Sequence, residues 1–148
     1  MRKVIIYMIV LFIQVSLPLI QSEPSTSMNI PSIEEVKDFL KGRWYIAKGE
    51  GPGGAILVSG IYEITSTDIT ARFGKVIGKA DKYTILSVRP TKSGYGYFID
   101  MKINRQDAGK TSVEEWMVKS KELIIIRRSG FAPFGGKVKD MFLEIERI

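Results

Sequence analysis

The sequence predicts an all-β protein, an eight-stranded antiparallel up-and-down barrel with one short helix before its first strand. From Arg43 onward the 148-residue chain consists of short runs rich in Ile, Val, Thr, Tyr and Phe, separated by Gly, Pro, Asn or Asp. The links between these runs are too short for parallel crossovers, so consecutive strands must pair antiparallel. A meander of this kind either closes or leaves two exposed edges. We therefore favour closure, with an open sheet or half-barrel against the helix as the alternative.

The N-terminal residues have the pattern of an export signal. Arg2 and Lys3 supply positive charge, residues 4–20 are almost entirely apolar, and a stretch of polar and small residues follows. This pattern predicts a signal peptide over residues 1–22 and a flexible linker over residues 23–31. The alternative is an uncleaved membrane anchor, because the apolar run approaches the lower limit of about 17 residues for a membrane span. The location expected for the protein is periplasmic or secreted, or anchored in the membrane.

A short helix is predicted over residues 32–41. Ser32 and Glu35 form a capping box, in which each side chain can accept a hydrogen bond from the other residue's amide. One apolar face follows at helical spacing, formed by Ile33, Val36, Phe39 and Leu40. Gly42 can end the helix in the left-handed conformation. We expect this helix to lie under the floor of the barrel, within a single domain over residues 32–148.

Alternation predicts which side chains of the strands face the interior, because successive residues of a strand point to opposite faces. The predicted strands cover residues 43–48, 56–65, 68–74, 82–89, 95–103, 111–118, 122–128 and 138–147. Their predicted inward residues are Trp44, Ile46, Tyr62, Ile64, Ile69, Phe73, Tyr95, Tyr97, Ile99, Met101, Ile103, Met141, Leu143 and Ile145. Strand 122–128 is apolar on both faces, so alternation does not orient it.

A cavity inside such a barrel would be lined by a subset of the inward side chains. We expect a ligand there to contact Ile46, Tyr62, Ile64, Phe73, Tyr95, Tyr97, Ile99, Met101, Met141 and Leu143. Glu114 and Glu115 are adjacent and must face opposite sides of their strand, so one of them points inward or lies at a solvated rim. We expect the rim, where carboxylates ordinarily lie. An inward Glu would instead bind a cation or a ligand hydroxyl.

Gly42-Arg43-Trp44 begins the first predicted strand directly after the helix, and Arg147 ends the inward set of the last strand. This arrangement resembles the lipocalins, within the broader calycin group, in which Gly-x-Trp begins the first strand and a late Arg lies over the indole. The resemblance covers residues 32–148 and implies a closed end sealed by Gly42, Trp44 and Arg147. The chain departs from that family at the turn between its sixth and seventh strands, where it lacks Thr-Asp-Tyr.

The predicted topology also assigns the links to two ends of the barrel. The links opposite the helix are the longer, glycine-containing ones, which can open over a cavity: residues 49–55, 75–81, 104–110 and 129–137. Basic residues outnumber acidic ones around this mouth. We expect Arg127 and Arg128 to bind an acidic head group there. Phe131 and Phe134 would cap the cavity, or contact a membrane surface or a protein.

Composition excludes several kinds of site. The chain contains no His and no Cys, so disulfides, thiolate nucleophiles, Cys/His zinc sites and Ser-His-Asp triads are absent. We expect neither a metal nor another cofactor. The formal charge of +6 favours anionic partners. Nucleic acid is not among the expected partners, because the aromatic residues fall mostly on inward faces and the chain carries an export signal.

These features predict an exported protein that holds a small apolar or amphiphilic ligand, whose head group can be anionic. The alternative is a protein-interaction or inhibitor module of the cell envelope or extracellular space, without a small-molecule ligand. An enzyme is a third interpretation, in which a buried Tyr with Glu115 or a rim Lys transfers a proton without His. No residue spacing demands catalysis, and no pattern indicates an oligomeric state.

Overall fold

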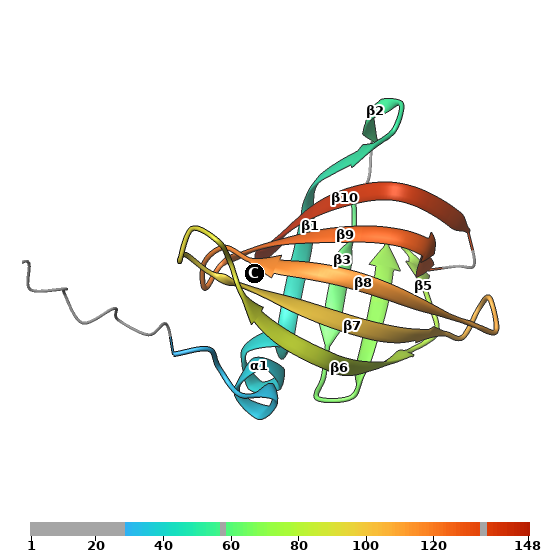
Figure 1. Ribbon diagram of the computed structural model, residues 1–148. Coiled ribbons are helices and arrows are strands. Elements are labelled where there is room, and N and C mark those ends of the chain that lie inside the picture. The colour runs from blue at the N-terminus through green and yellow to red at the C-terminus, as the bar shows by residue number, and fades with distance from the viewer. Residues whose placement is uncertain (1–28, 57–58, 134–135) are drawn as a thin grey trace, which may run out of the picture.

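The computed structural model describes residues 29–148 except 57–58 and 134–135 (Figure 1). The predicted signal peptide, most of the predicted linker and Phe134 therefore lie outside the described residues. Within the described residues, no helix is long and apolar enough to cross a membrane.

The described part of the chain forms a closed antiparallel barrel. Its elements are α1 (Ile33–Leu40), β1 (Gly42–Gly51), β2 (Gly54–Ile56), β3 (Ile61–Ile64), β4 (Asp68–Phe73), β5 (Val76–Ile77), β6 (Asp81–Pro90), β7 (Tyr97–Arg105), β8 (Lys110–Val118), β9 (Leu123–Phe131) and β10 (Lys137–Arg147). Eight strands pair in the order β1–β3–β4–β6–β7–β8–β9–β10, and β10 pairs with β1 to close the ring. This confirms the predicted barrel and excludes the open sheet.

Two short strands lie outside that ring. β2 pairs with the far part of β1 as a hairpin that projects from the barrel (Figure 1), and β5 pairs with the end of β4. Of the strand predicted over residues 56–65, Ile56 ends β2 and residues 61–64 form β3, and both β2 and β3 pair with the same edge of β1.

Helix α1 begins as predicted but ends differently. The Ser32 hydroxyl accepts from the Glu35 amide at 3.3 Å, and the Glu35 carboxylate accepts from the Ser32 amide at 2.7 Å. Lys41, with φ −54° and ψ 136°, ends the helix in an extended conformation. Gly42 has φ +125° and is the first residue of β1, so its predicted role as helix terminator is wrong. It turns the chain into the barrel at an angle that other residues rarely adopt.

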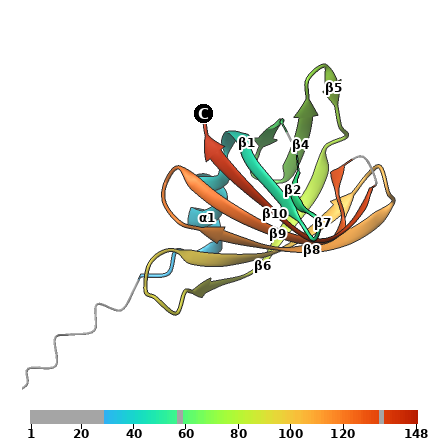
Figure 2. The ribbon, with the colours of Figure 1, turned by 90° about the horizontal axis from the view of Figure 1, so that it is seen from above.

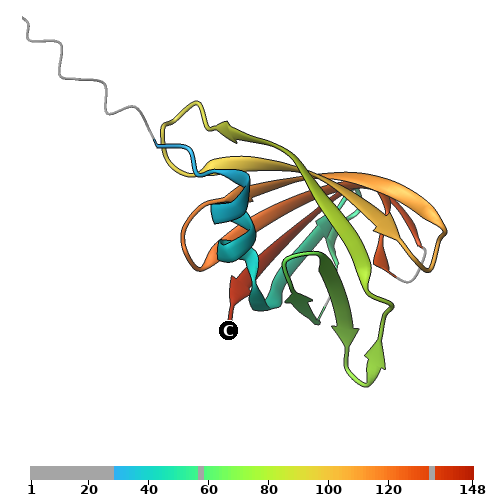
Figure 3. The ribbon, with the colours of Figure 1, turned by 90° about the horizontal axis from the view of Figure 1, so that it is seen from below.

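The closed end is sealed by Trp44 and Arg147, as predicted. The Arg147 guanidinium lies 4.1 Å from the Trp44 ring centroid and 5.1 Å from that of Phe39. It also donates to the carbonyl oxygens of Phe39, Lys41 and Lys121, while Trp44 Nε1 donates to the Leu40 carbonyl at 2.8 Å. Figure 3 shows α1 beside the end of β10. These contacts attach the helix to the first and last strands.

Burial confirms most of the predicted interior. The core contains Val36 and Leu40 of the helix together with inward residues of the strands: Trp44, Ile46, Tyr62, Ile64, Ile69, Ile99, Met101, Ile103, Leu143 and Ile145. Tyr95 is 81% exposed, so its predicted inward position is wrong. Gly94 and Gly96 have φ of +81° and +72°, which makes this segment a turn and delays β7 until Tyr97.

The seam between β4 and β6 is short. Only two residue pairs join these strands, Asp68 with Lys82 and Ile69 with Asp81. Toward the open end β4 pairs with β5 instead, and Figures 2 and 3 show the β4–β5 hairpin projecting from the barrel. The wall of the barrel is therefore incomplete on this side of the mouth.

Replacing Arg147 with Lys should lower the free energy of unfolding by about 2 kcal/mol, because Lys keeps the charge but loses the planar stacking and part of the donor set. Urea denaturation followed by tryptophan fluorescence measures this change. The matched control is Arg43→Lys, since Arg43 is exposed and lies 3.8 Å from Glu63 at the surface. Its effect should stay within about 1 kcal/mol; equal losses in both variants would contradict the proposed seal.

Candidate ligand-binding site

A hydrogen-bonded group of polar side chains lies inside the barrel near its open end. We call it the interior polar cluster, and its members are Asp81, Arg105, Glu114, Arg128, Tyr62 and Trp116. Each of these residues is at most 4% exposed. They come from β6, β7, β8, β9 and β3, so the cluster joins opposite walls of the barrel.

Glu114 is the centre of this cluster. Its carboxylate accepts hydrogen bonds from Arg105 Nη2, from Arg128 Nε and, at 2.9 Å, from Trp116 Nε1. The rim position expected for this residue is therefore wrong, and the inward alternative holds. Burial of the carboxylate is tolerated because two guanidinium groups and an indole satisfy it.

Charge keeps Glu114 ionised in spite of its burial. Desolvation alone would raise the pKa of Glu114, but the charges of Arg128 and Arg105 and the hydrogen bonds from Arg128 and Trp116 hold it below its ordinary value. The pKa of Arg128 is raised, since Glu114 and Tyr62 outweigh the cost of burying its charge. Both groups therefore stay charged at neutral pH.

Arg105 connects the cluster to the links at the mouth. Its Nη1 donates to Asp81 Oδ2 at 2.8 Å, and its Nε donates to the Phe131 carbonyl at 2.9 Å. Asp81 also accepts from the Gln106 amide at 2.8 Å. Three links predicted to share the open end are thus bonded to one another, which confirms that assignment.

Arg128 and Tyr62 form the edge of the cluster that faces a pocket. Arg128 Nη2 donates to the Tyr62 hydroxyl at 3.1 Å, and the same nitrogen lies 3.4 Å from Glu114 Oε2. Among the described residues, Arg128 Nη1 has no hydrogen-bond partner and the Tyr62 hydroxyl donates to no acceptor. Both residues therefore retain donor capacity beside the pocket.

The pocket at the open end has a volume of about 350 Å³. It is lined by residues of five strands and one link: Tyr62, Phe73, Val76, Arg128, Ala132, Pro133, Met141 and Leu143. Its walls are almost entirely apolar, and among the described lining residues only Tyr62 and Arg128 carry polar side chains. Such a combination can hold an apolar molecule and bind one polar atom of it.

The structure brings together five of the predicted site residues at this pocket: Tyr62, Phe73, Arg128, Met141 and Leu143. Four others are packed in the core and do not line it: Ile46, Ile64, Ile99 and Met101. Tyr97 lies at the closed end, in a groove with residues 29–31. Phe131 is partly buried, with its ring 5.9 Å from the Lys110 ammonium.

Two further predictions about the mouth fail or remain open. The Arg127 side chain is 57% exposed on the outer face and lies 3.9 Å from Asp140, so it does not face the pocket. Strand alternation explains this, because the inward residues of β9 are Ile124, Ile126 and Arg128. Phe134 lies outside the described residues and stays a prediction.

Asp81, Arg105 and Glu114 were not expected in the interior. A signal existed for Arg105, because it continues the inward series Ile99, Met101 and Ile103 along β7. Glu114 likewise continues the inward series of β8 with Trp116.

The enzyme interpretation named Glu115 as the carboxylate that transfers a proton together with a buried Tyr. Glu115 instead lies on the outer face of the barrel, where it accepts a hydrogen bond from Arg89 at 2.8 Å.

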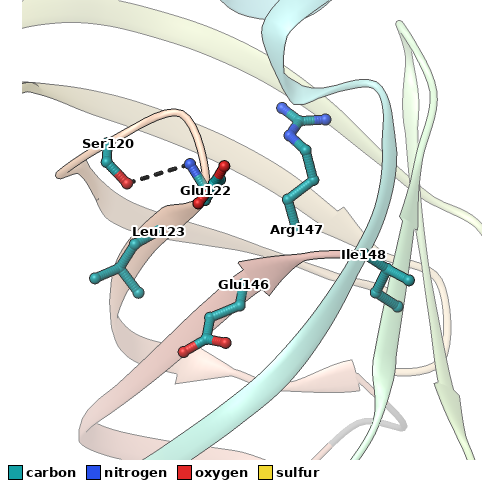
Figure 4. Close-up of a pocket in the computed structure, with 6 residues that line it drawn as sticks. All are labelled: Ser120, Glu122, Leu123, Glu146, Arg147 and Ile148. Atoms are coloured by element: carbon teal, nitrogen blue, oxygen red, sulfur yellow. Dashed lines mark hydrogen bonds between the residues drawn. The ribbon is translucent and has the colours of Figure 1, made fainter.

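A second hollow, of about 490 Å³, lies at the closed end (Figure 4). Glu146 and Arg147 line it but point in opposite directions, and Arg147 is already bonded to backbone carbonyls. Within the described residues there is also no group of three or more acidic side chains that could hold a metal ion. The open-end pocket is therefore the better candidate site.

Comparison with known proteins adds no assignment. No protein-family model matches this chain, and neither a curated protein nor a solved structure matches it.

Glu114→Gln should lower the free energy of unfolding at neutral pH by about 3 kcal/mol, because it leaves two buried guanidinium groups with too little negative charge. The folded-state pKa of Glu114 is lowered, so its contribution is present above the unfolded pKa of about 4.3 and is lost as pH falls through the folded value. Wild-type stability should therefore decline in acid more steeply than that of the variant. Urea denaturation over a pH series measures both slopes.

Glu115→Gln is the matched control, because the same substitution one residue along β8 removes a charge from the outer face. Its effect on stability should be at most about 1 kcal/mol. Equal acid sensitivity in wild type and the Glu114 variant would contradict an ionised, buried Glu114.

Proposed function

We propose that this protein binds a small apolar or amphiphilic molecule in the pocket at the open end of its barrel. The observation that carries the proposal is the make-up of this pocket. Phe73, Met141 and Leu143 give it apolar walls, and Tyr62 and Arg128 place hydrogen-bond donors at one side. Ligand sites in proteins commonly combine mostly apolar walls with a few placed polar groups.

The packed core limits how deep such a ligand lies. Ile99, Ile124 and Ile126 are 0% exposed and fill the barrel on the closed-end side of the cluster. The pocket of about 350 Å³ is near the lower end of the 300–1,000 Å³ that ligand sites span. We therefore propose a small ligand held at the mouth, rather than a long one threaded through the barrel.

The polar groups beside the pocket are held in position before any ligand arrives. Glu114 fixes the Arg128 guanidinium through Nε, and Tyr62 accepts from its Nη2. Fixed side chains lose little conformational entropy when a ligand binds. This arrangement favours a binding function for the cluster in addition to a structural one.

A lipocalin-like identity is part of this proposal. The stacking of Arg147 on Trp44 beneath a short helix is the feature that the resemblance implied for the closed end. It supports a barrel in which one end is sealed and the other admits a ligand.

Protein interaction without a small ligand is the second candidate function, and exposed Tyr95 favours it. Tyr95 is 81% exposed on a turn where the Thr91 hydroxyl donates to the Tyr95 carbonyl at 2.7 Å. Exposed aromatic residues on ordered turns are typical contact points of interfaces. This function requires no occupied pocket, so the binding experiment below separates the two candidates.

Met141→Trp should weaken binding of the apolar fluorescent probe N-phenylnaphthylamine by at least about tenfold, because the indole fills space that the probe needs. Fluorescence titration of wild type and variant measures this loss. The matched control is Phe142→Trp, which adds an indole at the neighbouring residue of β10, a 42% exposed position outside the pocket. Equal probe affinity in all three proteins, or no binding by wild type, would overturn the proposal and favour protein interaction.

We also propose that the protein acts outside the cytoplasm after removal of residues 1–22, as the charge and hydropathy pattern of these residues indicates. Intact-mass measurement and N-terminal sequencing of protein from its native source should then give a chain that starts at Glu23. A chain that retains residues 1–22 and sediments with membranes would favour the anchored alternative.

A further inference from the structure

We infer that the pocket selects ligands that carry a neutral oxygen acceptor, an alcohol or carbonyl oxygen, over ligands that carry a carboxylate. This inference rests on the proposed binding function and names the chemistry of the ligand's polar atom. The neutral oxygen takes the place of the acidic head group that we expected from the basic residues of the mouth.

The first observation is an unused donor on Tyr62. This residue is 1% exposed, and its hydroxyl accepts from Arg128 Nη2 at 3.1 Å. Among the described residues no atom accepts its proton, although the residue lines the pocket. A buried donor without an acceptor is unfavourable, so an oxygen atom supplied by a ligand would satisfy it.

The second observation is the remaining capacity of Arg128. Its Nε and Nη2 are engaged by Glu114 and Tyr62, whereas Nη1 has no hydrogen-bond partner in the described part of the chain. Arg128 and Tyr62 are bonded to each other and both line the same pocket. Their unused N–H and O–H groups can therefore converge on one ligand oxygen.

The third observation is the charge balance of the cluster. Two guanidinium groups, Arg105 and Arg128, face two carboxylates, Asp81 and Glu114, and all four side chains are buried. A ligand carboxylate would add a third negative charge without an unpaired buried cation to compensate it. Its desolvation would therefore cost more than its contacts with Arg128 return, whereas a neutral oxygen avoids this cost.

Among the described residues, no basic side chain other than Arg128 lines the pocket and could bind an anion. Arg127 lies on the outer face beside Asp140, and no Lys lines the pocket among the described residues. Donor capacity without excess positive charge is suited to an alcohol, ether, ester or ketone.

The inference can be tested by displacement of N-phenylnaphthylamine with octane, octanol and octanoate at neutral pH. Octanol should displace the probe at least about tenfold better than octanoate, because only the carboxylate carries the desolvation cost. Tyr62→Phe should weaken octanol binding relative to octane binding by about three- to tenfold, as expected for loss of one neutral hydrogen bond.

Tyr83→Phe is the matched control, because it removes another inward tyrosine hydroxyl, one that donates to the Thr65 carbonyl at 2.8 Å away from the pocket. Its octanol affinity should equal that of wild type. Circular dichroism verifies folding of both variants, and the wild-type ranking decides the question if Tyr62→Phe does not fold.

Octanoate binding as tight as octanol binding, or full octanol affinity in folded Tyr62→Phe, would overturn the inference while leaving the binding function intact. Failure of the binding function would give a different result. Wild type would then not bind the probe, or Met141→Trp would bind the probe with the same affinity as wild type.

Discussion

The ion pairs of Glu114 with Arg105 and Arg128 are the interaction on which the open half of the barrel depends. Side chains from three successive strands meet at this carboxylate, and Arg128 extends the contact to Tyr62 on the opposite wall. Arg105 also holds the links of the mouth through Asp81 and the Phe131 carbonyl. A charged group of this kind requires specific partners in specific places, which fixes the geometry of the adjoining pocket.

The two ends of the barrel are thus built from different interactions. At the closed end a cation lies against aromatic rings and satisfies backbone carbonyls, with α1 packed over it. At the open end, buried charges of both signs satisfy one another beside an apolar pocket. The apolar core of the barrel separates these two sets of interactions.

Much of this architecture could be predicted from the sequence, because alternation and turn residues are local signals. The barrel, the helix and the sealing pair Trp44 and Arg147 follow from such signals. The position of Tyr95 did not follow from these signals, because its neighbour Gly96 lies in a turn rather than in a strand. Gly96 approaches the Val118 carbonyl so closely that a Cβ at this position would lie 2.1 Å from the carbonyl oxygen. The polar cluster was missed for another reason: alternation places Glu114 inside, but only three-dimensional pairing shows that distant arginines neutralise it.

The short seam between β4 and β6 gives the barrel a mechanical asymmetry. A closed ring of strands resists widening through the hydrogen bonds of every seam, and here one seam contains only two residue pairs. Motions that enlarge the mouth need to break the fewest bonds at this point, and Val76 on the neighbouring hairpin is itself part of the pocket wall. Opening of the mouth therefore meets the least resistance at the β4–β5 hairpin, while the cluster on the other side holds the side chains of Tyr62 and Arg128 in position.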